Sequence, residues 1–328
     1  MKTKNPTISL LKGLAIFSVV CAHCYSIPAY AGEFERACSL ILHNLGTLGV
    51  LVFFVVSGYL FRVTDVKSFL AKKALGICLP WLVGATAVYL YVALRKPPIT
   101  LGDYVSFLFG NGSYFYYLTV LMLLYLLFLF LPFLRRTAAC VAMMAITVAS
   151  VFFLYSVELV YITQYLNILN WCGYFALGVF IRTHQDKVRR VFLALYRFRF
   201  AFYAAYIGVL VYQFFADGGG GYWGVPNAFF AWLGAFCLLL LAEALGHRSE
   251  RGAQRILIRM GDTSLFVYIW HMPIAGIVTN LFSRQPLTVA VLARPFVVLG
   301  VVLVACRLAE LVLKKVKAEK IGIAFGIR

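Results

Sequence analysis

Two ionisable side chains interrupt a long apolar stretch near the N-terminus, residues 8–31. Lys12 and His23 are eleven positions apart, so on an α-helix they lie within about 20° of each other around the axis and about 16 Å apart along it. Polar groups inside an apolar helix usually face a bundle interior or a wet cavity, which makes this shared face a candidate site. Two simpler alternatives stay open: Lys12 anchors the helix at the membrane surface, and His23 only hydrogen-bonds to a neighbouring helix.

A second group of polar side chains, Ser264, Tyr268 and His271, is spaced four and then three residues apart. This spacing places all three on one helix face. Pro273 follows two positions after the histidine, and because proline has no N–H it predicts a kink, as is common where a membrane cavity is shaped. We expect this face to form a cavity wall in which His271 supplies a hydrogen-bonding group.

Five further polar side chains lie in or beside other apolar stretches. Ser57 precedes a glycine, and such small residues let helix backbones approach closely. Lys72 and Lys73 precede the third apolar stretch, where they can either hold phosphate or anchor the helix. Tyr117 belongs to an aromatic cluster typical of membrane interfaces, and Tyr125 lies about two turns deeper.

The composition is that of a polytopic membrane protein, because 63% of the 328 residues are hydrophobic and 13% are charged. Apolar stretches of about 20 residues, the length that a helix needs to cross hydrocarbon, predict an all-α membrane helix bundle of about ten transmembrane helices. We expect one domain, residues 1–328. The net charge of +18 does not indicate nucleic-acid binding, since the basic residues lie at the ends of apolar stretches. The predicted spans are 8–31, 43–61, 75–94, 115–134, 138–156, 166–182, 200–216, 225–245, 264–282 and 292–313.

The distribution of lysine and arginine predicts the orientation of the bundle. Most of the 30 basic residues fall in alternate segments on the side of the N-terminus, among them 62–75, 182–199 and 247–261. The positive-inside rule then places both termini in the cytoplasm, and we expect the first apolar stretch to stay as a span because it has no convincing cleavage site. The predicted outer segments are 28–42, 95–114, 156–165, 217–224 and 283–291.

The cysteines predict neither a disulfide framework nor a metal site. All eight are scattered, mostly inside apolar stretches where a thiol behaves as a small hydrophobe. Cys21-Ala-His-Cys24 has the C-x-x-C spacing, but no second cluster completes a set of ligands. We therefore expect no metal cofactor.

Taken together, these motifs resemble the integral-membrane acyltransferase-three family, which O-acylates bacterial surface sugars. The resemblance extends over nearly the whole chain, and its most specific element is a basic residue and a histidine separated by ten residues, here Lys12 and His23. The family has arginine at the first position, and it has two arginines before the third span where this chain has Lys73 and Gly76. The other matching segments are Gly49…Phe53-Phe54…Ser57-Gly58-Tyr59-Leu60, Lys73…Pro80, Tyr117-Leu118…Tyr125, Gly173-Tyr-Phe-Ala-Leu-Gly178 and Ser264…Tyr268…His271.

The resemblance implies a multi-pass enzyme of the bacterial cytoplasmic (inner) membrane. Acetyl-CoA is the expected acyl donor and co-substrate, and the acceptor is a hydroxyl of a surface polysaccharide or lipid-linked glycan. His23 is the implied catalytic residue, either as a general base or as the site of an acyl-histidine intermediate. The residues expected to bind substrate or donor are Lys12, Lys72, Lys73, Ser57, Tyr117, Tyr125, Ser264, Tyr268 and His271.

Two other functions fit the same sequence. Membrane domains similar to this family occur attached to amino-acid racemases, which suggests a transporter of a small polar solute such as serine. The departures at Lys12 and Gly76 also fit a structural subunit without activity. Consumption of acetyl-CoA distinguishes the enzyme from both alternatives.

Overall fold

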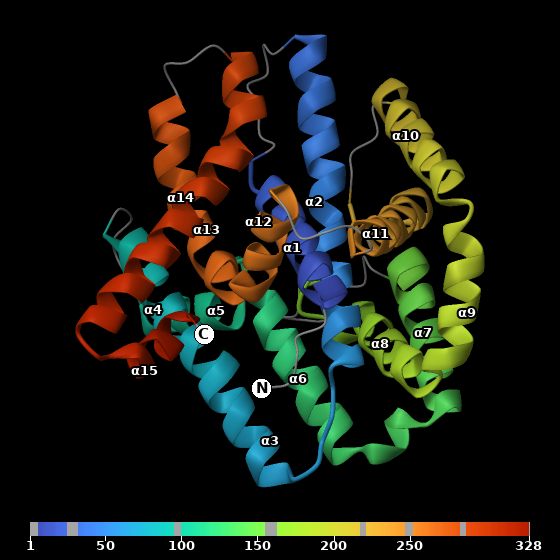
Figure 1. Ribbon diagram of the computed structural model, residues 1–328, viewed down its shortest axis with the longest axis horizontal. Helices are drawn as coiled ribbons and strands as arrows, with labels where there is room; N and C mark the ends of the chain where they lie inside the picture. Colours follow the sequence, from blue (N-terminus) through green and yellow to red (C-terminus); the bar gives the residue numbers. More distant parts are fainter. Residues whose placement is uncertain are drawn as a thin grey trace.

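The computed structural model describes residues 6–24, 32–94, 100–154, 163–216, 221–246, 252–282 and 287–327, and over these residues it is built from helices with no strand. Figure 1 shows the arrangement of the helices. They are α1 (Pro6–Cys21), α2 (Glu33–Tyr59), α3 (Val66–Lys73), α4 (Leu79–Ala93), α5 (Leu101–Phe109), α6 (Tyr116–Phe130), α7 (Thr137–Ala149), α8 (Cys172–Thr183), α9 (Gln185–Tyr196), α10 (Arg199–Phe215), α11 (Val225–Gly246), α12 (Ala253–Asp262), α13 (Ser264–Phe282), α14 (Leu287–Lys315) and α15 (Glu319–Gly322). Five short helical turns complete the described elements: Ala74–Cys78, Pro132–Arg135, Ser150–Leu154, Ile168–Asn170 and Ile323–Phe325.

Six helices among the described residues are long and apolar enough to cross a membrane. They are α2, the continuous helix Val66–Ala93, Thr137–Leu154, α11, α13 and Val291–Lys315. The pair α9 and α10, bent by 72°, makes a seventh if it is counted as one span, and α1, α6 and α8 are shorter apolar helices. The all-helical membrane-type bundle is thus confirmed, whereas ten crossings and cytoplasmic termini stay predictions.

The boundary between the first two predicted spans was wrong. Helix α1 ends at Cys21 and is followed by a turn through Cys24, and residues 25–31 lie outside the described part. Helix α2 begins at Glu33, about ten residues before the predicted start, so most of the predicted outer loop is helical. The reason is that its first turns are polar and escape a hydropathy count, while acidic side chains there favour the helix N-terminus. Arg36 also pairs with Glu33 at 2.9 Å.

A second correction concerns the third predicted span, which was expected to begin at residue 75, just after Lys72 and Lys73. Both belong to α3, which begins where the Asp65 side chain accepts a hydrogen bond from the backbone N–H of Ser68 at 2.7 Å. The helix continues through the turn Ala74–Cys78 into α4. Side-chain capping of this kind starts a helix at a polar position that hydropathy alone does not mark.

Helices were also missed inside predicted loops. Helix α5 lies in the predicted outer segment 95–114 and starts with a capping box in which Thr100 and Asp103 bond to each other's backbone N–H. Helix α12 lies in the predicted inner segment 247–261. Parts of the predicted loops, residues 95–99, 156–162, 217–220, 247–251 and 283–286, lie outside the described residues.

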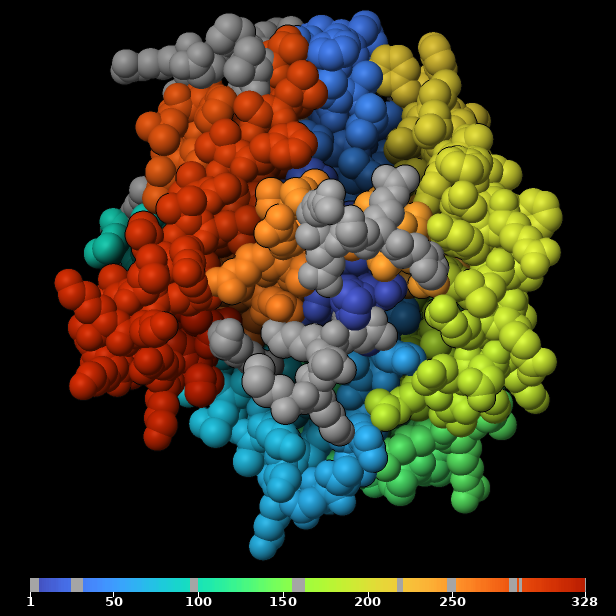
Figure 2. Space-filling model, viewed as in Figure 1, coloured from blue at the N-terminus to red at the C-terminus, as the bar shows by residue number. Residues whose placement is uncertain are grey.

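Helix α1 is central to the bundle. It contacts α2, α11, α12, α13 and α14, and it is encircled by other helices in Figures 1 and 2. Glycines allow its closest packing: a Cβ on Gly13 would lie 2.0 Å from the Leu257 carbonyl oxygen, and one on Gly261 would lie 1.9 Å from that of Ser9. Only glycine fits at such a crossing.

The predicted close helix packing at Gly58, the glycine that follows Ser57, is confirmed. Helices α2 and α8 cross where a Cβ on Gly58 would lie 2.0 Å from the Phe175 carbonyl oxygen. A Cβ on Gly178, from the opposite helix, would lie 2.0 Å from the carbonyl oxygen of Val55. Both glycines are therefore needed to bring the two backbones together.

Candidate active site

The predicted catalytic histidine, His23, lines a large cavity, which we call the histidine cavity. It has a volume of about 1020 Å³, at the upper end of the range for small-molecule sites. Residues from α1, α2, α4 and α13 line it together with the segments that precede α6, α8 and α11. Its polar members are His23, His43, Thr47, Tyr91, Ser113, Tyr114, Tyr116, Thr163, Gln164, Tyr165, Tyr222 and Tyr268.

His23 and His271 come together although they are far apart in the sequence. The ring of His23 lies in the turn after α1, and its centroid is 5.0 Å from that of His271 on α13. His23 lines the histidine cavity, whereas His271 is fully buried and lies behind it. Tyr114 contacts both rings, with centroid distances of 6.3 Å to His23 and 5.2 Å to His271. The two predicted polar faces therefore meet at their histidines.

Pro273 leaves one backbone carbonyl of α13 without its helical partner, and this carbonyl helps to position the site. In a regular α-helix the N–H of residue 273 would bond to the carbonyl of Ile269, but proline has no N–H. The Tyr114 hydroxyl replaces it and donates a hydrogen bond to that carbonyl at 2.6 Å. The Tyr268 hydroxyl donates in the opposite direction, to the Tyr114 carbonyl. The segment before α6 is thus fastened to α13 beside the two histidines.

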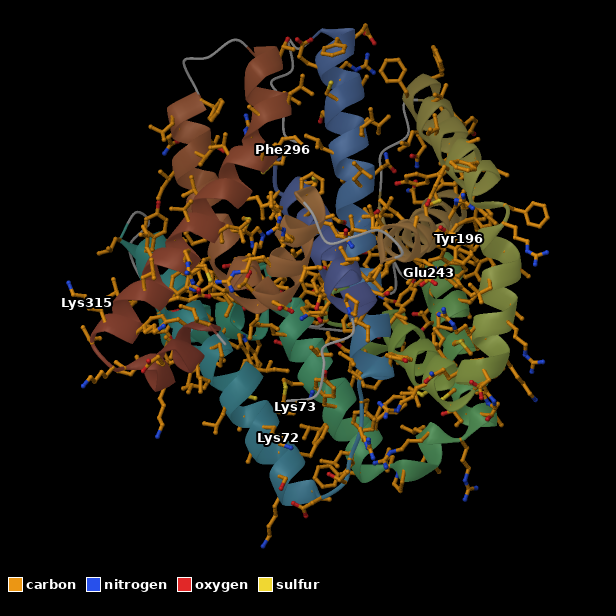
Figure 3. The ribbon with its side chains drawn as sticks, in the orientation of Figure 1. Lys72, Lys73, Tyr196, Glu243, Phe296 and Lys315 are labelled. Atoms are coloured by element: carbon orange, nitrogen blue, oxygen red, sulfur yellow. The ribbon has the colours of Figure 1, made fainter. Side chains whose placement is uncertain are left out.

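The second part of the site is a cluster of basic and aromatic side chains, which we call the lysine cluster: Phe61, Phe69, Lys73, Tyr125 and Arg135. The Lys73 ammonium lies 3.7 Å from the Tyr125 ring centroid and 5.3 Å from that of Phe69, a cation–π arrangement. Among the described residues Lys73 forms no ion pair. Its charge is therefore available to an anion. Figure 3 labels Lys72 and Lys73 on α3, beside α6.

Arg135 in the lysine cluster has a structural role as well. Its guanidinium donates hydrogen bonds to the backbone carbonyls of Phe128 and Leu129, at 2.9 Å and 3.1 Å. These are among the last carbonyls of α6, which have no partner within the helix. The same guanidinium lies 5.3 Å from the Phe61 ring centroid, so it holds the end of α6 against the aromatic members of the cluster.

A row of buried tyrosines connects the two parts of the site. Tyr125 and Tyr117 are eight residues apart on α6, about 12 Å along the helix. The Tyr117 ring lies 5.4 Å from that of Tyr268, which lies 6.0 Å from His271. Ser57 lies close to the Tyr117 hydroxyl. Four predicted site residues therefore lie between Lys73 and the histidines.

Three predicted site residues lie elsewhere. Lys12 is half-buried on the part of α1 that packs against α12 and does not line the histidine cavity. Lys72 is exposed. Ser264 is buried at the start of α13, away from the cavity lining. Conversely, sequence reasoning missed Tyr114, which it treated only as part of an interfacial aromatic cluster.

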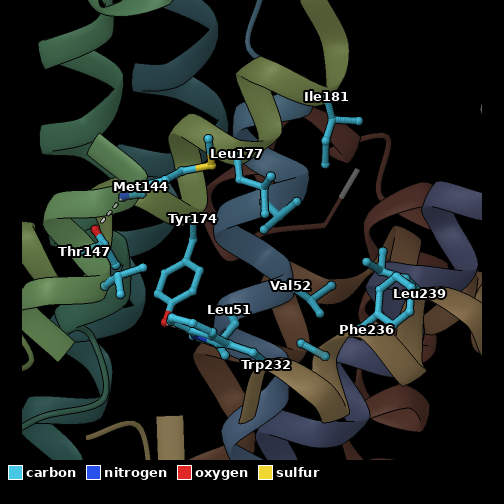
Figure 4. Close-up of a pocket in the computed structure, with 14 residues that line it drawn as sticks. Leu51, Val52, Met144, Thr147, Tyr174, Leu177, Ile181, Trp232, Phe236 and Leu239 are labelled. Carbon is cyan, nitrogen blue, oxygen red and sulfur yellow. Dashed lines mark hydrogen bonds between the residues drawn. The ribbon is translucent and has the colours of Figure 1, made fainter. Parts of the chain in front are cut away.

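A second cavity, of about 330 Å³, lies on the other face of α2 (Figure 4). Its lining from α2, α7, α8 and α11 is almost entirely apolar, and its main polar feature is a hydrogen bond of 2.7 Å from the Trp232 indole to the Tyr174 hydroxyl. It contains no acid or base that works near neutral pH. Of these two cavities, the histidine cavity is therefore the better candidate for the chemistry.

The comparisons with known proteins identify the family. The chain matches a family described as an acyltransferase domain over residues 5–309. Neither the curated proteins nor the solved structures contain a significant match. The matched range contains both histidines, the lysine cluster and the row of tyrosines between them. Because the match covers nearly the whole chain, the protein belongs to the acyltransferase-three family that its motifs resemble.

Proposed function

We propose that the protein is a membrane O-acyltransferase that moves an acetyl group from acetyl-CoA to a hydroxyl of a surface polysaccharide or lipid-linked glycan. Family membership supports acyl transfer. The observation that carries the proposal is the contact between His271 and His23, which lines a cavity that has several polar lining residues and is large enough for a sugar. A histidine in contact with such a cavity suits the removal of a proton from an acceptor hydroxyl.

The lysine cluster suits the phosphates of the donor. Lys73 supplies a positive charge without an ion-pair partner among the described residues, and an ammonium is a common phosphate ligand. Lys72 is exposed one residue away, whereas Lys12, also predicted to bind the donor, lies on α1 outside this cluster. The pantetheine arm would then follow Tyr125, Tyr117 and Tyr268 towards His23.

The reaction needs a base because an uncharged hydroxyl is a poor nucleophile. In the proposed step, the acceptor O–H gives its proton to a ring nitrogen of His23 as its oxygen bonds to the thioester carbonyl carbon. The C–S bond then breaks, and the imidazolium returns the proton to the departing sulfur, so the products are an ester and free CoA thiol. Transfer through an acyl-histidine at His23 is the alternative chemistry.

The predicted orientation assigns the two parts of the site to opposite sides of the membrane. With both termini in the cytoplasm, the residues Ser113, Gln164 and Tyr222 of the cavity lining belong to predicted outer segments. Lys73 and Arg135 belong to predicted inner segments. Donor binding from the cytoplasm and acceptor binding from outside then fit an enzyme of the bacterial cytoplasmic membrane that modifies surface glycans.

The test uses purified protein in liposomes with labelled acetyl-CoA and candidate acceptors, namely bacterial surface polysaccharide and lipid-linked sugars. The proposal expects release of free CoA and label in an acceptor. Uptake of a solute such as serine with acetyl-CoA intact would instead favour the transporter. If neither transfer nor uptake is observed, the result would favour an inactive subunit.

A further inference from the structure

His271 is held in one tautomer by its own helix. Its Nδ1 lies 2.7 Å from the backbone carbonyl oxygen of Tyr268 and 3.1 Å from that of Val267. A carbonyl oxygen only accepts, so Nδ1 must carry the proton. In the neutral ring Nε2 is then the unprotonated nitrogen, and its lone pair can only accept.

That Nε2 atom is buried and accepts no hydrogen bond from the described residues. The side chain as a whole is fully buried, where an unmet acceptor costs free energy. The two neighbouring tyrosines are not available as donors, since the hydroxyls of Tyr114 and Tyr268 already donate to backbone carbonyls. His23 is the adjoining polar side chain with an N–H to offer.

The distance between the rings suits such a bond. A ring nitrogen lies about 1.15 Å from the centroid of an imidazole, so centroids 5.0 Å apart allow facing nitrogens to approach to about 2.7 Å, a hydrogen-bond distance. The interplanar angle is 47°, so the hydrogen bond requires a rotation of the half-buried His23 ring that turns one nitrogen towards Nε2. The other nitrogen of His23 would then face the histidine cavity, which His23 lines.

We propose that His271 is a positioning residue that accepts a hydrogen bond from His23 at Nε2 and so leaves the cavity-facing nitrogen of His23 unprotonated. This inference rests on the proposed function, and it gives the base a third group that orients it, as in other nucleophile–base arrangements. His271 neither gains nor loses a proton. It holds the N–H of His23 while the opposite nitrogen takes the acceptor proton and later returns it to the CoA sulfur.

Two substitutions separate positioning from other roles. His271→Gln places an amide near the position of Nε2, where its oxygen can still accept from His23. His271→Asn reaches only to the position of Nδ1 and cannot. We expect His271→Gln to keep kcat within about 10-fold of the wild type and His271→Asn to lose about 10²-fold, with KM for acetyl-CoA unchanged in both. The matched control is His184→Gln, which replaces a histidine that lines neither cavity.

Solid-state NMR of histidine-labelled protein in liposomes supplies a readout independent of catalysis. The expected result is a contact between a protonated nitrogen of His23 and the unprotonated Nε2 of His271. This contact should be absent from the His271→Asn variant. Equal kcat losses in folded Gln and Asn variants, or a protonated Nε2 in the wild type, would overturn the inference. If the wild type transfers no acetyl group, the proposed function fails and the NMR contact alone decides whether the hydrogen bond exists.

Discussion

The hydrogen bond from Tyr114 to the Ile269 carbonyl should depend on Pro273. Tyr114→Phe removes the hydroxyl that satisfies this carbonyl but keeps the ring that contacts both histidines. In the wild type no N–H at residue 273 can take its place. In a Pro273→Ala background the new N–H can bond to Ile269 as in a regular helix, so the hydroxyl becomes dispensable.

The expected magnitudes follow from the cost of an unmet buried acceptor. Tyr114→Phe alone should lower the free energy of unfolding by about 1–3 kcal/mol, the penalty for a stranded carbonyl. In the Pro273→Ala background the same change should cost less, about 0.5 kcal/mol, because the carbonyl keeps a partner. The double-mutant cycle should therefore show a coupling free energy of about 0.5–2.5 kcal/mol, the difference between the two costs.

The assay is reversible unfolding of the four proteins in mixed detergent micelles, supported by thermal melting. Tyr104→Phe is the matched control, since it removes a tyrosine hydroxyl that bonds to Thr86 at 2.7 Å and its cost should be the same with and without Pro273. If Tyr114→Phe lowers the free energy of unfolding by the same amount in both backgrounds, within about 0.5 kcal/mol, residues 114 and 273 act independently. That result would refute the proposal that the Tyr114 hydroxyl replaces the missing N–H of residue 273 as the hydrogen-bond donor.

Three further predictions address donor binding, orientation and packing. Lys73→Met should raise KM for acetyl-CoA with little change in kcat, since it removes binding common to the ground and transition states; an unchanged KM would exclude Lys73 from the donor site. A cysteine introduced at the exposed residue Lys187, in a background without native cysteines, should react with an impermeant thiol reagent only after cells are opened, and labelling of intact cells would reverse the orientation. Gly58→Ala should lower the free energy of unfolding by about 1–3 kcal/mol, because its Cβ would lie 2.0 Å from the Phe175 carbonyl oxygen. Gly208→Ala, with nothing within 4 Å of its Cβ, should be neutral or stabilising, and equal losses would contradict the account of the crossing.

The sequence predicted the apolar helices well and the polar helix starts poorly. Helix α13 has the predicted bounds, because both its ends coincide with changes in hydropathy. Helices α2 and α3 begin earlier than predicted, since Glu33 and Asp65 stabilise helix starts that hydropathy reads as loops. Helix α12, Ala253–Asp262, was missed because its apolar residues alternate with polar and charged ones, so a hydropathy count does not mark it.

The candidate site was predicted in its parts but not in its assembly. Helical spacing could place Ser264, Tyr268 and His271 on one face, but it carried no information that this face would meet His23. The role of Tyr114 depends on a carbonyl freed by Pro273 on another helix. Such a contact between distant residues has no local signal in a single sequence.

The most direct test of the central claim compares the wild type with His23→Ala in liposomes supplied with labelled acetyl-CoA and acceptor. CoA affinity is measured on the same preparations, and thermal melting verifies folding. If His23 removes the acceptor proton, the substitution should lower kcat by about 10²–10⁴-fold while CoA binding persists. Acetyl transfer by folded His23→Ala at the wild-type rate would contradict the assignment of His23 as the base.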